Sequence, residues 1–191
     1  MVQRSGVRVQ APVMTAEELI MQLDLKPHKE GGFFAEAWRS PEKLAVNALP
    51  PRYSGSRTLS TSIYYLLTSD TFSRMHRLRS DEVFHFYLGD PVEMLLLGPR
   101  SGRDKQMEHD VPPGIITILG NDIKAGQRPQ IVVPRGTWQG AHLLSKKKGA
   151  FALMGTTTAP GFEYDDYQEG ERARLVEEYP GFAEKIRELT R

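Results

Sequence analysis

The middle of the chain consists of short runs in which apolar and polar residues alternate, with many β-branched and aromatic side chains. Clusters of turn-forming residues such as Arg79-Ser80-Asp81 and Gly120-Asn121-Asp122 separate these runs. Such close spacing is typical of antiparallel hairpins and leaves no room for crossover helices. Eight strands are predicted, at residues 61–67, 72–78, 83–88, 92–97, 114–119, 130–133, 140–144 and 151–157. The pattern therefore indicates an all-β sandwich or barrel.

Both ends of the chain carry helical patterns instead. Thr15 can cap a helix with Glu18 as its reciprocal partner, and apolar residues follow on one side, which predicts a helix over about residues 15–23. A second helical segment is predicted at about 169–190, after a barrel that spans about 33–158. With 191 residues and no linker or internal repeat, we expect a single domain, 1–191.

Composition limits the partners and the chemistry. The 25 Lys and Arg residues balance 24 Asp and Glu residues, so no overall field favours nucleic acid or an anionic membrane. The absence of cysteine excludes disulfides, thiolate metal sites and a cysteine nucleophile. No apolar stretch approaches the roughly 18 residues that span a bilayer, and the first residues lack the apolar core of a secretory signal. We expect a cytoplasmic protein without a nucleic-acid or membrane partner.

Two hairpins carry the candidate chemistry. Alternation along the strand 72–78 places Arg74, His76 and Leu78 on one face, which we expect to point inward. On the next strand Glu82 shares a face with Phe84, whereas His85 points the opposite way unless a bulge turns it.

A second stretch ends a strand in a Pro-x-Gly turn and then presents a polar side chain. Pro134-Arg135-Gly136 makes this turn, and Gln139 follows at the start of the next strand. The two hairpins are candidates to converge on one site.

These residues have the spacing of known motifs. His76-x-Leu78, Glu82 and Gly89 are similar to the first cupin motif, and Pro134-x-Gly136 with Gln139 is similar to the second. The segments Glu30-Gly31-Gly32-Phe33-Phe34, 60–67, 81–91 and 133–139 resemble, more narrowly, the cupin subfamily called domain of unknown function 985, or cupin superfamily 5. The resemblance spans about residues 16–180.

The resemblance implies a double-stranded β-helix, or jelly roll, with short N- and C-terminal helices. Such barrels commonly form homodimers by strand exchange and hold a pocket at one mouth, so we expect a homodimer that binds a small polar, carbohydrate-like ligand. It does not imply one activity, because cupins include oxygenases, isomerases, epimerases, storage proteins and sensors.

The chain departs from the metal-binding cupin pattern at two positions. Leu78 stands where a second histidine ligand would be, and Gln139 stands where the last one would be. A leucine cannot ligate, and an amide oxygen is a weak neutral donor. We therefore expect no cofactor. The alternative is a divalent transition metal on the incomplete set His76, Glu82 and Gln139.

Without a metal, the imidazole and the carboxylate still suit proton transfer near neutral pH. By analogy with metal-free cupin epimerases, His76 is the candidate base with Glu82 as its orienting partner, and the acid would come from Tyr64, Tyr65 or Tyr87. The alternative is that His76 and Glu82 are buried partners with a purely structural role. The residues predicted to line the pocket are Arg74, Gln139, Ser60, Ser62, Phe84 and Trp138.

Three classes of function remain open at this point. The first is a metal-free isomerase or epimerase that acts on a carbohydrate-like ligand. The second is a metal-dependent enzyme, and the third is a binding module that holds its ligand unchanged.

Overall fold

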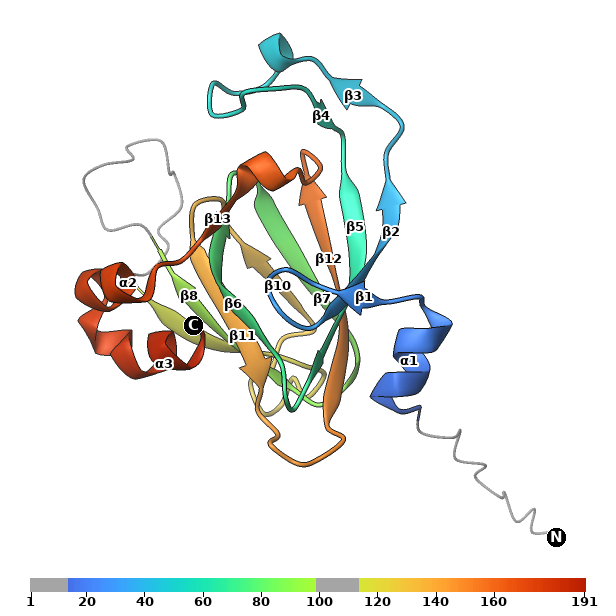
Figure 1. Ribbon diagram of the computed structural model, residues 1–191, viewed down its shortest axis with the longest axis vertical. Helices are drawn as coiled ribbons and strands as arrows, with labels where there is room; N and C mark the ends of the chain where they lie inside the picture. The colour runs from blue at the N-terminus through green and yellow to red at the C-terminus, as the bar shows by residue number, and fades with distance from the viewer. Residues whose placement is uncertain (1–13, 99–113) are drawn as a thin grey trace, which may run out of the picture.

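The computed structural model describes residues 14–98 and 114–191 and confirms the predicted all-β jelly roll with short terminal helices (Figure 1). Two antiparallel sheets form the barrel. The first has the order β1 (Lys26–Pro27), β2 (Phe33–Arg39), β5 (Thr61–Thr68), β12 (Phe151–Ala159), β7 (Asp81–Gly89) and β10 (Gln130–Val133). The second has the order β13 (Tyr167–Glu169), β6 (Phe72–Leu78), β11 (Trp138–Leu143), β8 (Val92–Leu97) and β9 (Ile115–Leu119).

A small ribbon projects beyond the barrel at the top of Figure 1. It pairs β3 (Lys43–Leu44) with β4 (Arg57–Thr58), and the 3-10 helix η1 (Val46–Ala48) lies in the loop between them. The ribbon connects β2 to β5, so it belongs to the same end of the barrel as the mouth described below.

The helix α1 (Ala16–Gln22) covers part of the outer face of the six-stranded sheet. Its predicted capping box is present: the Thr15 amide donates to a Glu18 carboxylate oxygen at 2.8 Å, and the Glu18 amide donates to the Thr15 hydroxyl at 3.2 Å. Ala16 and Leu19 are buried against Leu66 and other apolar residues of the sheet. The capping box that the sequence predicted thus determines where this helix begins.

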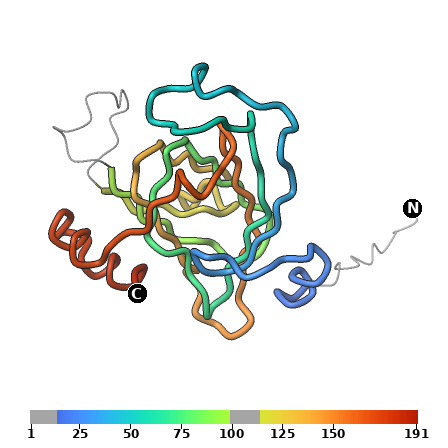
Figure 2. Tube along the Cα trace, turned by 45° about the horizontal axis from the view of Figure 1, so that its top comes forward, coloured from blue at the N-terminus to red at the C-terminus, as the bar shows by residue number. Residues whose placement is uncertain are grey.

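The C-terminal helices cover the outer face of the five-stranded sheet. They are α2 (Arg172–Glu178), the 3-10 helix η3 (Pro180–Phe182) and α3 (Ala183–Glu188). Figures 1 and 2 show them on the side of the barrel opposite α1. Leu175 and Ile186 are fully buried there, in a second core separate from the barrel interior.

This second core explains why β8 is apolar at every position after Glu93. Met94 and Leu96 point into the barrel interior, whereas Leu95 and Leu97 point outward into the core beneath the helices. All four are buried, because the strand has an apolar neighbour on each face. None of the helices between residues 14 and 98 or between 114 and 191 is long and apolar enough to cross a membrane.

Candidate functional site

A cavity of about 250 Å³ lies over the inner face of the six-stranded sheet. Polar side chains from four strands and two loops meet in its wall together with a few apolar ones. The lining residues are His28, Glu30, Phe34, Glu36, Arg39, Thr61, Ile63, Leu78, Glu82, Thr156, Thr158, Phe162, Glu163 and Tyr164. The two carboxyl groups of Glu30 and Glu82 are the most deeply buried acids in this wall.

Glu30 reaches the cavity because the loop before β2 folds back onto β6. The His28 amide donates to the Gly32 carbonyl, and the Arg74 amide donates to the Glu30 carbonyl, both at 2.9 Å. Gly31 has φ +111°, and a Cβ there would lie 2.1 Å from the Phe72 carbonyl oxygen. Only glycine fits so close to the neighbouring backbone, so Gly31 allows the loop to place Glu30 at the barrel mouth.

The Glu30 carboxylate lies between two histidine rings. Its Oε2 is 3.5 Å from His76 Nε2 and 3.7 Å from His28 Nδ1. His76 Nδ1 is 2.7 Å from the Arg74 carbonyl, so this nitrogen carries the proton and donates it, and Nε2 is left as an acceptor. His28 Nδ1 accepts the Glu30 amide hydrogen at 3.1 Å. His76 Nε2 is therefore an acceptor that faces the carboxyl, and it favours the protonated form of Glu30.

Burial determines the charge of Glu30 and of the two histidines beside it. Burial, with a smaller contribution from Glu169, raises the pKa of Glu30 to about 8. Burial, with a smaller effect of His76, lowers the pKa of His28 to about 4. Burial also lowers the pKa of His76, against the opposing influence of Glu82. At neutral pH the site consequently holds two neutral imidazoles and a protonated Glu30.

Glu82 has a different environment on the same cavity wall. Gln139 Nε2 donates to its Oε2 at 2.7 Å. Burial raises the pKa of Glu82, but His76 and hydrogen bonds from Thr156 and Gln139 oppose the shift. The carboxyl of Glu30 receives no hydrogen bond from the described residues, whereas the hydrogen bonds that Glu82 accepts favour its ionised form.

His76 and Gln139 are direct partners across β6 and β11, so the two hairpins do meet at one place. The pairing then slips, because Ala141 pairs with Ser73, so that two residues of β6, Arg74 and Met75, oppose one of β11. This bulge changes the alternation that the sequence predicted. Arg74 instead forms an ion pair with Glu169 at 3.0 Å and is not in the cavity wall.

His76 also lies behind the wall rather than in it. Only 2% of the residue is exposed, and its contact with the cavity passes through Glu30. The ring of Tyr167 stacks on it with centroids 5.5 Å apart. In the structure His76 is thus a partner of the groups that face the cavity.

Four other predicted lining residues lie elsewhere. Trp138 points outward into the core beneath the C-terminal helices, where the Arg77 guanidinium lies 4.5 Å from its ring centroid. Ser60 and Ser62 are not in the wall, since the alternation of β5 directs Thr61 and Ile63 inward instead. Phe84 is buried in the barrel interior, beneath the cavity rather than on its surface.

The tyrosines considered as acids have other roles in the structure. The Tyr65 hydroxyl donates to the Gly31 carbonyl at 2.9 Å and so holds the loop that carries Glu30. Tyr64 and Tyr87 pack against each other with centroids 6.2 Å apart and are not in the wall. The tyrosine in the cavity wall is Tyr164, from the 3-10 helix η2 (Tyr164–Asp166).

His85 lies on the face opposite the cavity, as alternation predicts. Its Nε2 is 3.4 Å from the Thr157 hydroxyl, whereas Thr156 and Thr158, on either side of Thr157, line the cavity. The bulge in β7 comes later along the strand, after Phe86, and so does not turn His85 inward.

The donor set does not fit a transition metal. Leu78 presents an apolar wall at the position of a second histidine, and the amide nitrogen of Gln139 is directed at Glu82. Within residues 14–98 and 114–191, no group of three or more His, Asp or Glu side chains has a geometry that could hold a metal ion. Of the set expected from the sequence, only the imidazole of His76 and the carboxylate of Glu82 are left, and these are too few ligands for a stable Fe, Mn or Zn site.

Comparison with known proteins agrees with the motifs and the barrel. The family described as Cupin superfamily (DUF985) matches residues 17–169. The chain belongs to this family. The uncharacterized protein YML079W of Saccharomyces cerevisiae is 30% identical over 164 residues, which cover 82% of this chain and 75% of the yeast protein.

Two solved structures are similar over nearly their whole length. Protein SO0799 from Shewanella oneidensis has a TM-score of 0.76 and 31% identity, covering 94% of this chain and 99% of that one. A hypothetical protein from Leishmania major has a TM-score of 0.77 and 29% identity, covering 93% and 99%. These cupins share the barrel, and their names assign no activity.

Sequence reasoning missed Glu30 and His28. The segment Glu30-Gly31-Gly32 was part of the family resemblance, but nothing local to it indicates a place beside His76. The signal in the sequence was the pair Gly31-Gly32. Two consecutive glycines allow a tight turn that packs closely against another backbone, and such a turn can carry the preceding acidic side chain into a site.

Proposed function

We propose that this cupin is a metal-independent isomerase or epimerase, which moves a proton next to the carbonyl group of a small, sugar-like substrate. One observation carries the proposal: two buried carboxyls share the wall of a small cavity, one facing His76 and the other accepting a hydrogen bond from Gln139. Paired titratable groups whose environments separate their protonation states are typical of acid–base catalysis.

In the proposed reaction Glu82 acts as the base and Glu30 acts as the acid. The Glu82 carboxylate removes the proton from the carbon beside the carbonyl, and the electrons of that C–H bond form the C=C bond of an enediol. The carbonyl oxygen takes the proton of the Glu30 carboxyl as its own π bond opens. Glu82 is then protonated and Glu30 is ionised.

The second half of the reaction restores both groups. Glu82 returns its proton to the former carbonyl carbon, and Glu30 takes the hydroxyl proton from the neighbouring carbon, where the new carbonyl forms. No oxidant or reductant is consumed. His76 acts as a positioning residue, because its Nε2 faces the Glu30 carboxyl at 3.5 Å before the substrate arrives.

The remaining wall suits a polyhydroxylated ligand. Hydroxyls of Thr61, Thr156 and Thr158 offer donors and acceptors, and Phe34 and Ile63 offer an apolar surface for C–H groups. The cavity volume of about 250 Å³ is slightly below the range of about 300–1,000 Å³ typical of sites for drug-sized ligands. A monosaccharide-sized substrate matches this wall better than a large one.

A panel of aldoses and ketoses tests the proposal, with products separated by chromatography. Wild-type protein is expected to convert at least one sugar, and Glu30→Gln and Glu82→Gln are each expected to lower kcat by about 10²-fold or more. The control variant Glu177→Gln removes an exposed carboxyl from α2 and should keep full activity. A sugar that binds saturably but is never altered would contradict the proposal and favour a binding module.

A further inference from the structure

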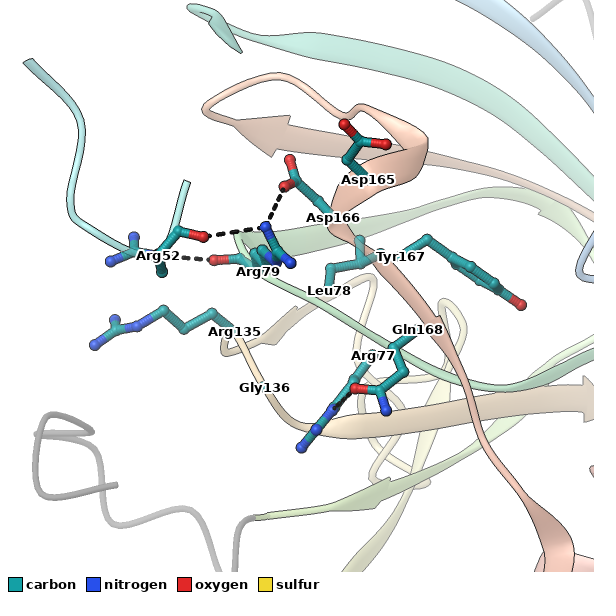
Figure 3. Close-up of a pocket in the computed structure, with 10 residues that line it drawn as sticks. All are labelled: Arg52, Arg77, Leu78, Arg79, Arg135, Gly136, Asp165, Asp166, Tyr167 and Gln168. Atoms are coloured by element: carbon teal, nitrogen blue, oxygen red, sulfur yellow. Dashed lines mark hydrogen bonds and ion pairs between the residues drawn. The ribbon is translucent and has the colours of Figure 1, made fainter. Parts of the chain in front are cut away.

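A second and larger cavity, of about 440 Å³, lies outside the first one and is shown in Figure 3. Four arginines reach it from three separate parts of the chain, namely Arg52, Arg77, Arg79 and Arg135. Its other lining residues are Leu78, Gly136, Asp165, Asp166, Tyr167 and Gln168. The reaction proposed for the first cavity does not use these four guanidinium groups.

The acids in this wall do not balance the arginines. Arg57 Nε and Nη2 donate to the two carboxylate oxygens of Asp166, each at 2.7 Å, and both side chains are buried. Asp166 is thereby neutralised by a residue that is not in the cavity wall, and its contact with Arg79 is a long one of 4.0 Å. Asp165 is the other acid in the wall and is exposed. Even when Arg135 is not counted, Arg52, Arg77 and Arg79 outnumber Asp165, so the cavity carries an excess of positive charge.

Two of the guanidinium groups are fixed by neutral carbonyls. Arg52 Nε donates to the Arg79 carbonyl at 2.9 Å, and Arg79 Nη1 donates to the Arg52 carbonyl at 3.2 Å. These reciprocal bonds, drawn as dashed lines in Figure 3, tie the loop after η1 to the turn after β6. Each bond uses one of the five N–H donors of a guanidinium and leaves its charge uncompensated.

Arg77 is held in a similar way. Its Nε donates to the Gln168 side-chain oxygen at 2.8 Å, and its guanidinium lies over the Trp138 ring. Neither Arg52 nor Arg77 forms an ion pair with a carboxylate among residues 14–98 and 114–191. In Figure 3, the side chains of Arg52 and Arg135 extend in the same direction. The site is thus preorganised to receive an anion between fixed donors.

We propose that this cavity binds the phosphate group of a small molecule. Planar guanidinium forks bind tetrahedral oxyanions through paired, charge-assisted hydrogen bonds. Several forks around one cavity of this size fit a phosphate or diphosphate better than a single carboxylate. Leu78 lies in the wall of both cavities, so the two sites are neighbours. The phosphate site nevertheless stands independently of the proposed reaction.

Isothermal titration calorimetry at low ionic strength tests the site, with inorganic pyrophosphate and ribose 5-phosphate as probes. Saturable binding with a Kd of about 1 mM or below is expected for at least one probe, and the tighter of the two identifies free or esterified phosphate as the source. Binding should weaken as NaCl is added. Equal affinity for citrate would contradict a phosphate site.

The variants Arg52→Gln and Arg79→Gln each remove one exposed guanidinium, and each should weaken binding by about tenfold. The control Arg187→Gln removes the same charge from α3 and should bind as the wild type does. Thermal unfolding of each variant shows that the fold is kept. Wild-type affinity in both cavity variants, or no saturable heat with either probe, would overturn the proposal.

Discussion

Replacing Glu30 by glutamine isolates the titration of the buried carboxyl at the cavity wall. Glutamine has nearly the shape of a protonated glutamic acid but cannot ionise, so the variant keeps the neutral form at every pH. The pKa of Glu30 is about 8 in the folded protein, against an ordinary value of 4.5. Between these pH values the native state binds a proton that the unfolded chain has released.

The sign of the effect follows from this difference. Stability linked to the Glu30 proton is fully present below about pH 4.5 and is lost as the pH rises through about 8. The lowered pKa values of His28 and His76 act in the opposite direction, but only below the ordinary histidine value of 6.5. The raised pKa of Glu82 acts in the same direction as that of Glu30 but is common to both proteins, so the difference between wild type and Glu30→Gln from pH 6.5 to 8 reports Glu30.

The magnitude can be estimated for that window. One bound proton changes the free energy of unfolding by about 1.4 kcal/mol per pH unit, and the slope falls to half at the pKa itself. From pH 6.5 to 8, wild-type protein should lose about 1.5 kcal/mol relative to Glu30→Gln. Urea denaturation followed by the fluorescence of buried Trp138 measures both proteins across this range.

Glu177→Gln is the matched control, because it removes an exposed carboxyl from α2. It should follow the wild type at each pH. A free-energy difference between Glu30→Gln and wild type that stays constant from pH 6.5 to 8, or that moves in the other direction, would refute the reasoning.

Three further predictions concern the loop, the buried ion pair and metals. Gly31→Ala forces a Cβ to within 2.1 Å of a backbone oxygen and should destabilise the protein by about 1–3 kcal/mol in thermal unfolding. The Cβ of the control Gly181→Ala meets nothing within 4 Å, so this variant should leave the free energy of unfolding almost unchanged. Arg57→Met leaves the Asp166 carboxylate buried without its partner and should lower the free energy of unfolding by about 3–5 kcal/mol in urea denaturation. The control Arg39→Met breaks a more exposed ion pair and should lower it by about 0–1 kcal/mol. Equal losses would contradict the conclusion that burial makes the Arg57–Asp166 pair essential. Exhaustive chelation should leave sugar conversion and the melting temperature unchanged, as measured on protein purified without a metal-affinity tag; a loss restored by one metal ion would favour the metal-dependent alternative.

The barrel could be predicted from the sequence because its signals are local. Alternation and turn clusters located the eight central strands to within a few residues, and Thr15 with Glu18 located the first helix. The motif spacing also placed His76, Glu82 and Gln139 together, since β6, β7 and β11 are neighbours in a cupin barrel.

The rest of the site depends on contacts between distant segments. Arg74 pairs with Glu169 instead of lining the cavity, at a bulge in the β6–β11 pairing that strict alternation cannot anticipate. Trp138 turns outward because the C-terminal helices supply a second core, which no pattern within β11 reveals. Glu30 reaches His76 only after its loop docks on β6. The homodimer and the cytoplasmic location stay predictions.

Hydrogen exchange at the substrate carbon tests the central claim most directly. A sugar that the protein converts is incubated with it in D₂O, and deuterium at the carbon beside the carbonyl is followed by NMR. Proton transfer through Glu82 predicts deuterium incorporation by the wild type, and a loss of incorporation in Glu82→Gln. Conversion without any incorporated deuterium would indicate direct hydride transfer between the two carbons and would contradict the account.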